Sequence, residues 1–476
     1  MTSAATLRVG GTGPLAARLA PLVDAAQACL ARNIVPGRTP TEPPFFLQAG
    51  GGYDTPWTRD SAINTWQAAA WLAPEVARDT LGMVLDPDGE RVVWDTQWWD
   101  QIIWVLGARG LALVTGDRAW AERSYRIGVA TLLRLDERCF EPASGLYRGP
   151  AVMADGISGY PQQLHDPARA GESFVLDHPA THHLHSLSTN ATYVMALSAL
   201  GDLAEVVGAD AAHWRRRSGE LARRVMDAFW REEEGRFGYL LVDGRLTGEQ
   251  EGLGVALALL SGTATAEQAR ATVAGVRHAP RGLPAVVPAF EGYDADHFGR
   301  HGAALWPMIM GVWAQAVAAT GDAAAFGAEL DRLCGLFEGS GMEFFEVYHP
   351  VTGVPDGGWQ TGRQWRSEPD QTWSATTLLG TVLHGLAGLH PAPSGLALRP
   401  CLPPGTGRLD LLGVPWRGQA FDLLLHGTGS RVDSVLIDNV LIDNVLIDRQ
   451  PAHGALLSIE DPVPRTVDVF CSEEGK

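Results

Sequence analysis

The chain has 476 residues, of which 46% are hydrophobic and 19% are charged, and its formal net charge is −18. This composition predicts a globular protein with a large apolar core and excludes a disordered or collagen-like chain. The acidic balance argues against a nucleic-acid-binding protein, and the lack of an apolar run of about 18 residues argues against an integral membrane protein.

Helical periodicity dominates the chain up to about residue 390. Apolar residues recur at helical spacing in about twelve segments, which pair as hairpins. Thr115-Gly116-Asp117 and Thr320-Gly321-Asp322 each place a glycine that can end one helix before an aspartate that can cap the next. With no βαβ signal, this pattern predicts a mainly α fold, an (α/α)6 toroid of six hairpins around a central cleft. The predicted helices cover residues 15–32, 61–72, 74–85, 97–114, 119–135, 189–207, 211–230, 249–260, 266–276, 302–319, 323–337 and 371–389.

The remainder of the chain, after His390-Pro391, has the pattern of short alternating strands separated by turn residues. We therefore predict a helical domain over residues 1–390 and a small C-terminal β-sheet or sandwich over 391–476. In the second domain the sequence Val-Leu-Ile-Asp occurs three times, at a spacing of five residues from Val435. A period of five conflicts with the two-residue alternation of a strand. The repeat is interpreted as a slipped duplication held in a bulge or loop, with a binding role as the alternative.

Tryptophan is abundant, with 16 residues in the chain. Indole rings fill helical cores, but they also stack on sugar rings. Here tryptophan, glycine and polar residues concentrate in long loops between the hairpins, and loops of this length are usually functional. If these loops gather at one rim of the toroid, they predict a carbohydrate cleft there. The loops are residues 49–60, 86–100, 139–188, 277–301 and 341–370.

Hydrolysis of a glycosidic bond needs two carboxyl groups on opposite sides of the sugar. The loop around residue 155 offers the first candidate. Asp155 stands in a mostly apolar, glycine-rich stretch, where burial would raise its pKa and keep it protonated. The alternative is a simple Asp-Gly turn with Gly156.

The second candidate is Glu346, which is flanked by aromatic residues and followed by a turn. Its rivals are Glu343 and Glu368, and a solvated surface carboxylate is the alternative for all three. A third cluster, Trp57-Thr-Arg59-Asp60, combines groups that can clamp sugar hydroxyls, although an aspartate here can also serve as a helix cap.

Four motifs resemble those of six-hairpin glycosidases, namely glycoside hydrolase family 63 and the glucosidase module of bacterial glycogen-debranching proteins. They occur in the expected order over about residues 50–390, and they are more specific for the superfamily than for a substrate. One departure is Met-Ala-Asp where the family often has Trp-Met-Asp, and another is the loop 156–188. The motifs are Trp57-Thr-Arg-Asp, Gly145-Leu-Tyr with Met153-Ala-Asp, Phe298-Gly-Arg-His-Gly with Trp306-Pro, and Glu346-Val-Tyr-His-Pro-Val-Thr-Gly with Gln371-Thr-Trp-Ser.

The resemblance implies an exo-acting, inverting hydrolase of a short α-linked glycoside, most similar to an α-glucosidase, without a metal or organic cofactor. Asp155 would be the general acid and Glu346 the general base, with the two carboxyl groups roughly 6.5–9.5 Å apart to leave room for water. The substrate would be a small oligosaccharide or glycoside. The implied sugar-binding residues are Trp57, Arg59, Asp60, Tyr160, His301, Trp306, Trp359 and Trp365.

Several alternatives remain open at this point. On the same barrel they are a trehalase-like or rhamnosidase-like hydrolase, a phosphorylase using Arg363 and Arg366, or an epimerase or lyase using His301 or Tyr160. A noncatalytic sugar-binding protein is the alternative from another class. The histidine-rich segment 165–185 lacks the spacing of a metal site.

The start of the chain shows no secretion signal, and the five cysteines form no Cys-x-x-Cys pair. Both features favour reduced thiols and a cytoplasmic protein. No feature of the sequence specifies an oligomeric state.

Overall fold

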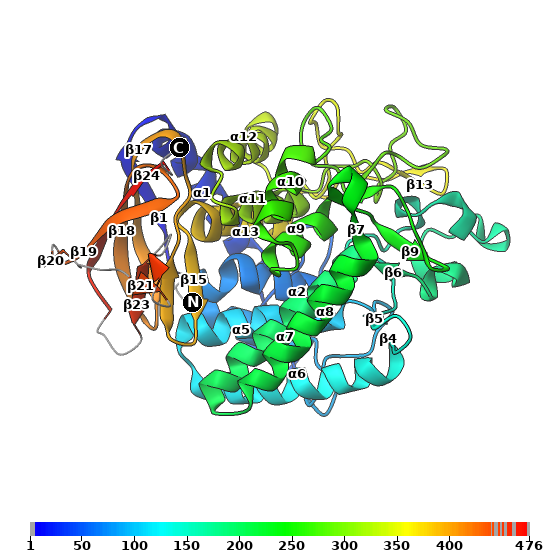
Figure 1. Ribbon diagram of the computed structural model, residues 1–476, viewed down its shortest axis with the longest axis horizontal. Helices are drawn as coiled ribbons and strands as arrows, with labels where there is room; N and C mark the ends of the chain where they lie inside the picture. Colours follow the sequence, from blue (N-terminus) through cyan, green and yellow to red (C-terminus); the bar gives the residue numbers. More distant parts are fainter. Residues whose placement is uncertain are drawn as a thin grey trace.

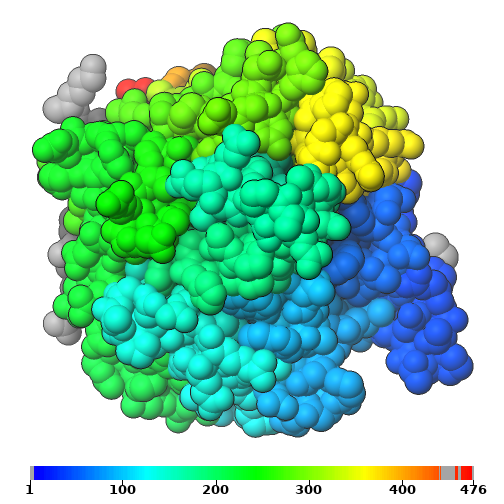
Figure 2. Space-filling view, turned by 90° about the vertical axis from the view of Figure 1, so that its right-hand side faces the viewer, coloured from blue at the N-terminus to red at the C-terminus, as the bar shows by residue number. Residues whose placement is uncertain are grey.

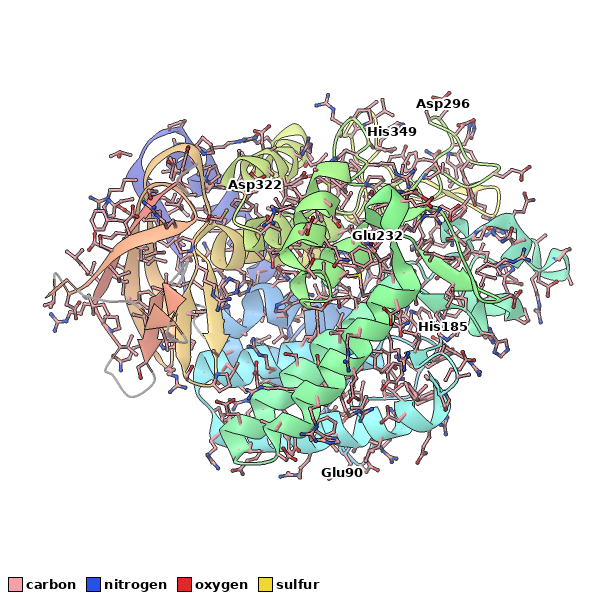
Figure 3. All side chains as sticks on the ribbon, viewed as in Figure 1. Glu90, His185, Glu232, Asp296, Asp322 and His349 are labelled. Atoms are coloured by element: carbon pink, nitrogen blue, oxygen red, sulfur yellow. The ribbon has the colours of Figure 1, made fainter. Side chains whose placement is uncertain are left out.

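The structure is a computed structural model that describes residues 5–438, 440–441, 446–447, 450–451, 455–458 and 463–473. The strand-rich C-terminal part lies at one end of the molecule, and the long loops lie at the opposite end of the helical part (Figure 1). Exposed acidic side chains such as Glu90 and Asp296 point outward from its periphery (Figure 3). None of the described helices has the length and apolar character that a bilayer span requires.

Each predicted helical segment is helical in the structure. α2 (Thr58–Asn64) continues through a π-helical turn, η1 (Thr65–Ala69), into α3 (Ala70–Leu72). α13 (Thr372–Gly380) likewise continues into η9 (Thr381–Leu386). Further helices are α1 (Pro14–Arg32), α4 (Pro74–Met83), α5 (Trp104–Thr115), α6 (Arg118–Arg138), α7 (Leu187–Val207), α8 (Ala211–Phe229), α9 (Gly252–Leu260), α10 (Ala266–Gly275), α11 (Pro307–Ala319) and α12 (Ala323–Gly339).

Two helix starts predicted from the sequence are wrong. The helix expected from residue 97 is a turn followed by a 3-10 segment, η2 (Gln101–Ile103), and α5 begins only at Trp104. The helix expected from residue 302 begins at Pro307, which suits the first helical position because proline has no N–H to leave unpaired. The residues before each helix form loops instead, and these loops contribute to the cavity described below.

The predicted glycine and aspartate signals at the hairpin turns are confirmed. Gly116 adopts the left-handed conformation with φ 70° at the end of α5, and the side chain of Asp117 accepts a hydrogen bond of 2.9 Å from the Trp120 amide in α6. Gly321, with φ 83°, and Asp322 repeat this arrangement between α11 and α12. Local sequence therefore sets where these hairpins turn.

Six helices contact one another in chain order. α2 packs against α5, α5 against α7, α7 against α9, α9 against α11 and α11 against α13, and α13 in turn contacts α2. Further helices pack onto this ring, α1 on α13, α8 on α7 and α12 on α11. Loops that precede ring helices lie at the end of the molecule away from the C-terminal sheet (Figures 1 and 2).

The predicted C-terminal sheet is present, and the N-terminal segment takes part in it. β1 (Arg8–Thr12) pairs antiparallel with β17 (Leu402–Trp416), which pairs with β18 (Gln419–Gly429). β24 (Thr466–Ser472) runs parallel to β18 and antiparallel to β19 (Arg431–Ile437). The order is β1-β17-β18-β24-β19-β20, in which β20 is Val440–Leu441. The domain division at residues 390 and 391 stays a prediction.

A second sheet of β15 (Leu389–Ala392), β16 (Gly395–Leu398) and β23 (Ala455–Ser458) follows the last helix. The first copy of the five-residue repeat lies in β19. Of the other two copies only β20 (Val440–Leu441) and β21 (Leu446–Ile447) are described, so the predicted bulge or loop lies outside the described residues. The short strands elsewhere are β2 (Ile34–Pro36), β3 (Phe45–Leu47), β4 (Phe140–Glu141), β5 (Leu146–Tyr147), β6 (His185–Ser186), β7 (Trp230–Arg231), β8 (Arg236–Phe237), β9 (Leu240–Val242), β10 (Arg245–Leu246), β11 (Gln250–Glu251), β12 (Val286–Val287), β13 (Trp359–Gln360), β14 (Arg363–Gln364) and β22 (Gln450–Pro451).

Glu251, buried just before α9, predicts a pH-dependent stability. Burial raises its pKa to about 8, although its carboxylate accepts a hydrogen bond of 3.0 Å from the Ser188 amide. Between the ordinary pKa of about 4.3 and this raised value, the folded state holds one proton more than the unfolded state. The free energy of unfolding therefore falls as pH rises through this window, by about 1.4 kcal/mol per pH unit for this group.

Glu251→Gln is expected to remove this slope, because glutamine is neutral and still accepts the hydrogen bond from Ser188. Urea unfolding of both proteins from pH 5 to pH 8 checks it. The advantage of the variant should grow with pH, and parallel curves would contradict the prediction.

Candidate active site

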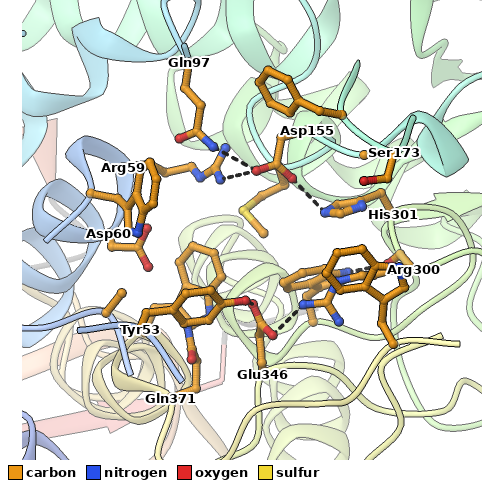
Figure 4. A pocket seen from close by; sticks show the side chains of 18 of the residues that line it. Tyr53, Arg59, Asp60, Gln97, Asp155, Ser173, Arg300, His301, Glu346 and Gln371 are labelled. Atoms are coloured by element: carbon orange, nitrogen blue, oxygen red, sulfur yellow. Dashed lines mark hydrogen bonds and ion pairs between the residues drawn. The ribbon is translucent and has the colours of Figure 1, made fainter. Parts of the chain in front are cut away.

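A cavity of about 380 Å³ opens among the loops at the end away from the C-terminal sheet. Its walls come from the segments before α2, α5, α7, α11 and α13, which are far apart in the chain (Figure 4). The loops that the sequence marked as functional therefore do meet at one place. The lining residues are Ala49, Tyr53, Trp57, Arg59, Asp60, Thr96, Gln97, Met153, Asp155, Gly156, Ser173, Phe174, Arg300, His301, Trp306, Glu346, Gln360, Trp365, Gln371 and Trp373.

The carboxyl group of Asp155 is held by three donors. Arg59, buried in the first turn of α2, places Nη2 3.1 Å from Oδ2, and Gln97 donates to the same oxygen at 2.9 Å. His301 places Nε2 2.8 Å from the other oxygen, Oδ1. A second branch of the Arg59 guanidinium pairs with Asp100 at 3.2 Å, which fixes its position.

The expectation of a raised pKa for Asp155 is wrong. Burial by itself would raise it, but the charges of Arg59 and His301 and their hydrogen bonds outweigh burial and hold the pKa well below its ordinary value. Both partners lie outside the loop of Asp155, so the local apolar sequence could not reveal them.

Glu346 faces the cavity from the opposite side to Asp155 (Figure 4). Its Oε2 accepts a hydrogen bond of 2.5 Å from Arg300, and its Oε1 accepts one of 3.0 Å from the Tyr53 hydroxyl. The rival Glu343 is exposed, and Glu368 is half-buried, and neither lines the cavity. Of the three glutamates considered from the sequence, the structure therefore brings only Glu346 to the cavity.

Asp60 is a third carboxyl group at the cavity. Its side chain is 6% exposed, and among the described residues no cation forms an ion pair with it. Burial raises its pKa to about 7, against the opposing charge of Arg59 and with the help of Glu346 and Asp155. A neutral carboxylic acid can both donate and accept hydrogen bonds, which suits contact with sugar hydroxyls.

The predicted aromatic contacts divide into two groups. Trp57, Trp306 and Trp365 line the cavity, and Trp57 and Trp365 keep 40% and 41% of their surface exposed. Trp359 lies in β13, outside the lining. Tyr160 differs from its predicted role, because it is fully buried and its hydroxyl is engaged with the Ala151 amide at 2.9 Å and the Ala154 carbonyl at 2.7 Å.

The structure adds lining residues that the sequence analysis did not select. Gln371 Oε1 and Trp373 Nε1 are buried without a hydrogen-bond partner, so they are available to a ligand. Tyr53 and Arg300 lie in two of the long loops that were expected to be functional. Nothing in the local sequence of either residue indicates that its side chain contacts Glu346. The residues added are Tyr53, Gln97, Arg300, Gln360, Gln371 and Trp373.

The histidine-rich loop is used for structure. His178 accepts from the Asp166 amide at 3.0 Å, and His182 lies 2.8 Å from the Leu176 carbonyl. Among the lining residues none comes from the histidines of segment 165–185, and Arg363 and Arg366 are exposed outside the cavity. The side chains of His178 and His182 therefore hold this loop together.

Gly156 allows the chain to pass close to His301. It has φ −102°, an ordinary conformation for any residue, but a Cβ here would overlap both Gln360 Oε1 and His301 Nδ1. Gly156→Ala is therefore expected to lower the free energy of unfolding by about 1–3 kcal/mol through overpacking. Urea unfolding measures it, with Gly171→Ala in the same loop as the control, because nothing lies within 4 Å of a Cβ there. Equal stabilities would contradict the steric argument.

Comparison with known proteins identifies a family. The family model described as the mannosylglycerate hydrolase MGH1-like glycoside hydrolase domain matches residues 53–374, a range that contains Asp155, His301 and Glu346. No curated protein matches the chain.

Solved structures with a similar fold are all distant in sequence. The GH63 mannosylglycerate hydrolase from Thermus thermophilus, in complex with Tris and D-glycerate, has a TM-score of 0.57 at 18% identity, covering 76% of this chain and 100% of that one. A sialidase has a TM-score of 0.65 at 15% identity, over 90% of this chain but only 40% of the sialidase. A rhamnosidase from Klebsiella oxytoca with rhamnose bound has a TM-score of 0.55 at 15% identity, over 81% of this chain and 66% of the rhamnosidase. This chain thus spans less than two thirds of the last two proteins, and the likeness shows the fold.

Proposed function

The chain belongs to the mannosylglycerate hydrolase MGH1-like glycoside hydrolase family, and from this membership we propose an exo-acting, inverting hydrolase of a short α-linked glycoside, with an α-glucoside as the favoured substrate. One observation carries the proposal. Asp155 and Glu346 enter the same cavity from opposite sides, as an acid and a base on either face of a sugar would (Figure 4).

In this mechanism Asp155 protonates the leaving glycosidic oxygen, and Glu346 accepts a proton from the attacking water. Arg300 and Tyr53 engage both oxygens of Glu346, which orients the carboxylate. Inversion requires roughly 6.5–9.5 Å between the two carboxyl groups, so that water fits between base and sugar.

The remaining lining residues suit a single sugar unit. Trp57 and Trp365 present exposed indole faces for stacking on the ring. Asp60 and the unpartnered polar atoms of Gln371 and Trp373 can bind its hydroxyl groups. We also propose that the closed series of contacts from α2 to α13 is the inner ring of an (α/α)6 toroid, with this cavity at its rim.

The charges of the cavity favour a neutral substrate. Both arginines in the described lining already form ion pairs. Arg59 pairs with Asp155 and Asp100, and Arg300 pairs with Glu346. An anionic leaving group such as glycerate would therefore meet Asp155 and Glu346, while both arginines of the lining are already paired with carboxylates.

The five free and buried cysteines support a cytoplasmic setting.

The test is a panel of α-disaccharides, aryl α-glycosides, mannosylglycerate and glucosylglycerate, with the anomer of the released sugar followed by NMR. Turnover of a neutral α-glucoside with inversion supports the proposal. Retention of configuration would overturn the mechanism, and faster turnover of a glycerate conjugate would overturn the preference for a neutral substrate.

A further inference from the structure

The amide of Gln360 has only one orientation that satisfies its neighbours. Its Nε2 donates to the Ser173 carbonyl at 3.2 Å, a partner that only accepts. Its Oε1 accepts a hydrogen bond of 3.2 Å from the Ser158 hydroxyl. The reversed amide would place its oxygen against the Ser173 carbonyl, so Oε1 must face His301.

This orientation decides the protonation of His301. Its Nδ1 lies 2.9 Å from Gln360 Oε1, which cannot donate, so Nδ1 must carry a proton and donate it. The other nitrogen, Nε2, lies 2.8 Å from Asp155 Oδ1. If His301 were neutral and Asp155 ionised, two lone pairs would face each other across this contact. The contact therefore needs one proton, on either the imidazole or the carboxyl group.

We propose that this shared proton is the one delivered to the leaving group, and that Gln360 is a positioning residue that holds His301 in the form able to store it. The inference deepens the proposed function and rests on it. It resolves an apparent conflict, because a carboxyl group held as an anion by Arg59 would be a poor acid without a proton source in direct contact.

The proton moves from His301 Nε2 to Asp155 and on to the glycosidic oxygen, while the bond between that oxygen and the anomeric carbon breaks and its electron pair stays on the oxygen. Water attacks the anomeric carbon from the other side and gives one proton to Glu346. His301 is left neutral with its proton on Nδ1. Solvent then removes the proton from Glu346 and restores one to the dyad of His301 and Asp155.

Aromatic and charged groups surround the dyad of His301 and Asp155. The Trp306 ring stacks on His301 with centroids 5.2 Å apart, and the face of an indole favours a cation. Two arginines oppose the extra proton. The carboxylate of Glu346 favours it, whereas Asp60 and Asp100, whose pKa values burial raises to about 7 and about 8, favour it only in their ionised form. The charged and titratable groups around the dyad are Arg59, Asp60 and Asp100, Arg300, and Glu346.

The first experiment observes the protonation of the two His301 ring nitrogens directly by NMR, and it does not depend on turnover of a substrate. In protein labelled with ¹⁵N-histidine, the ring signals of His301 are assigned by their loss in His301→Gln. Nδ1 is expected to carry a proton at every pH measured between 5 and 8, because Gln360 Oε1 can only accept. A neutral ring protonated only on Nε2 would overturn the proposal, whether or not any glycoside is turned over.

The second experiment tests whether the proton shared by His301 and Asp155 is used in catalysis. Gln360→Glu adds a negative charge beside Nδ1 and is expected to move the alkaline limb of kcat/KM upward by about one pH unit, whereas Gln360→Met should move it downward. His301→Gln should lower kcat on disaccharides by about 100-fold, with KM nearly unchanged, but lower it less than about tenfold on a glycosyl fluoride, whose leaving group needs no proton.

His297→Gln, an exposed histidine outside the cavity, is the control and should match the wild-type enzyme. An alkaline limb that is the same in all Gln360 variants would overturn the proposal. Equal losses of His301→Gln on both substrates would do the same. Absence of turnover on every glycoside would count against the proposed function, while the NMR result would still decide the protonation of His301.

Discussion

Glu346→Gln is expected to lower kcat on an α-glycoside by about 1,000-fold while changing KM little. A general base contributes roughly 10²–10⁴-fold, and glutamine keeps the shape of glutamate but cannot accept the proton from water. Glutamine Oε1 can still accept from Arg300 or Tyr53, so the site should keep its form. Steady-state kinetics on the substrate found in the panel measures the effect.

Two matched substitutions serve as controls. Glu343→Gln and Glu368→Gln change the same chemical group in the same loop, but neither residue lines the cavity. Both variants should keep wild-type rates. If Glu346→Gln retained activity and one of the others lost it, the base would have to be reassigned.

Asp155→Asn is expected to show a loss that depends on the leaving group. With a disaccharide, kcat should fall by about 1,000-fold, because the leaving oxygen departs without a proton. With a glycosyl fluoride, most of the activity should remain. A comparison of the two substrates on one enzyme preparation separates loss of the acid from loss of the fold.

Asp155→Asn also removes one of the two carboxylates that hold the buried Arg59, so its stability must be measured beside its rate. Asp177→Asn makes the same change in the same long loop, outside the cavity lining, and should leave both properties unchanged. Equal losses of Asp155→Asn on both substrates, in a folded protein, would contradict the role of general acid.

Structural features that depend on only a few neighbouring residues were predicted well from the sequence. Apolar periodicity located the helices, and the pairs Gly116-Asp117 and Gly321-Asp322 located two of their turns. The starts of α5 and α11 were missed because the apolar pattern continues into residues that form loops. The motifs also identified Asp60, Asp155, His301 and Glu346, which the fold brings to one cavity although they span most of the helical part.

Contacts between distant parts of the chain were decided by the tertiary structure alone. The apolar surroundings of Asp155 in the sequence predicted a raised pKa, whereas Arg59, 96 residues away, and His301 lower it. Tyr160 is a residue type that often contacts sugars, but here it is fully buried and does not line the cavity. β1, near the N-terminus, joins a sheet formed by the C-terminal part of the chain. The sequence by itself determined the helices, their turns and the candidate carboxyl groups, because periodicity, capping and motifs are local. Only the tertiary structure decided the direction of the Asp155 pKa shift, the placement of Glu346 rather than Glu343 at the cavity, and the contact between His301 and Asp155, because each depends on packing between segments that no local pattern encodes.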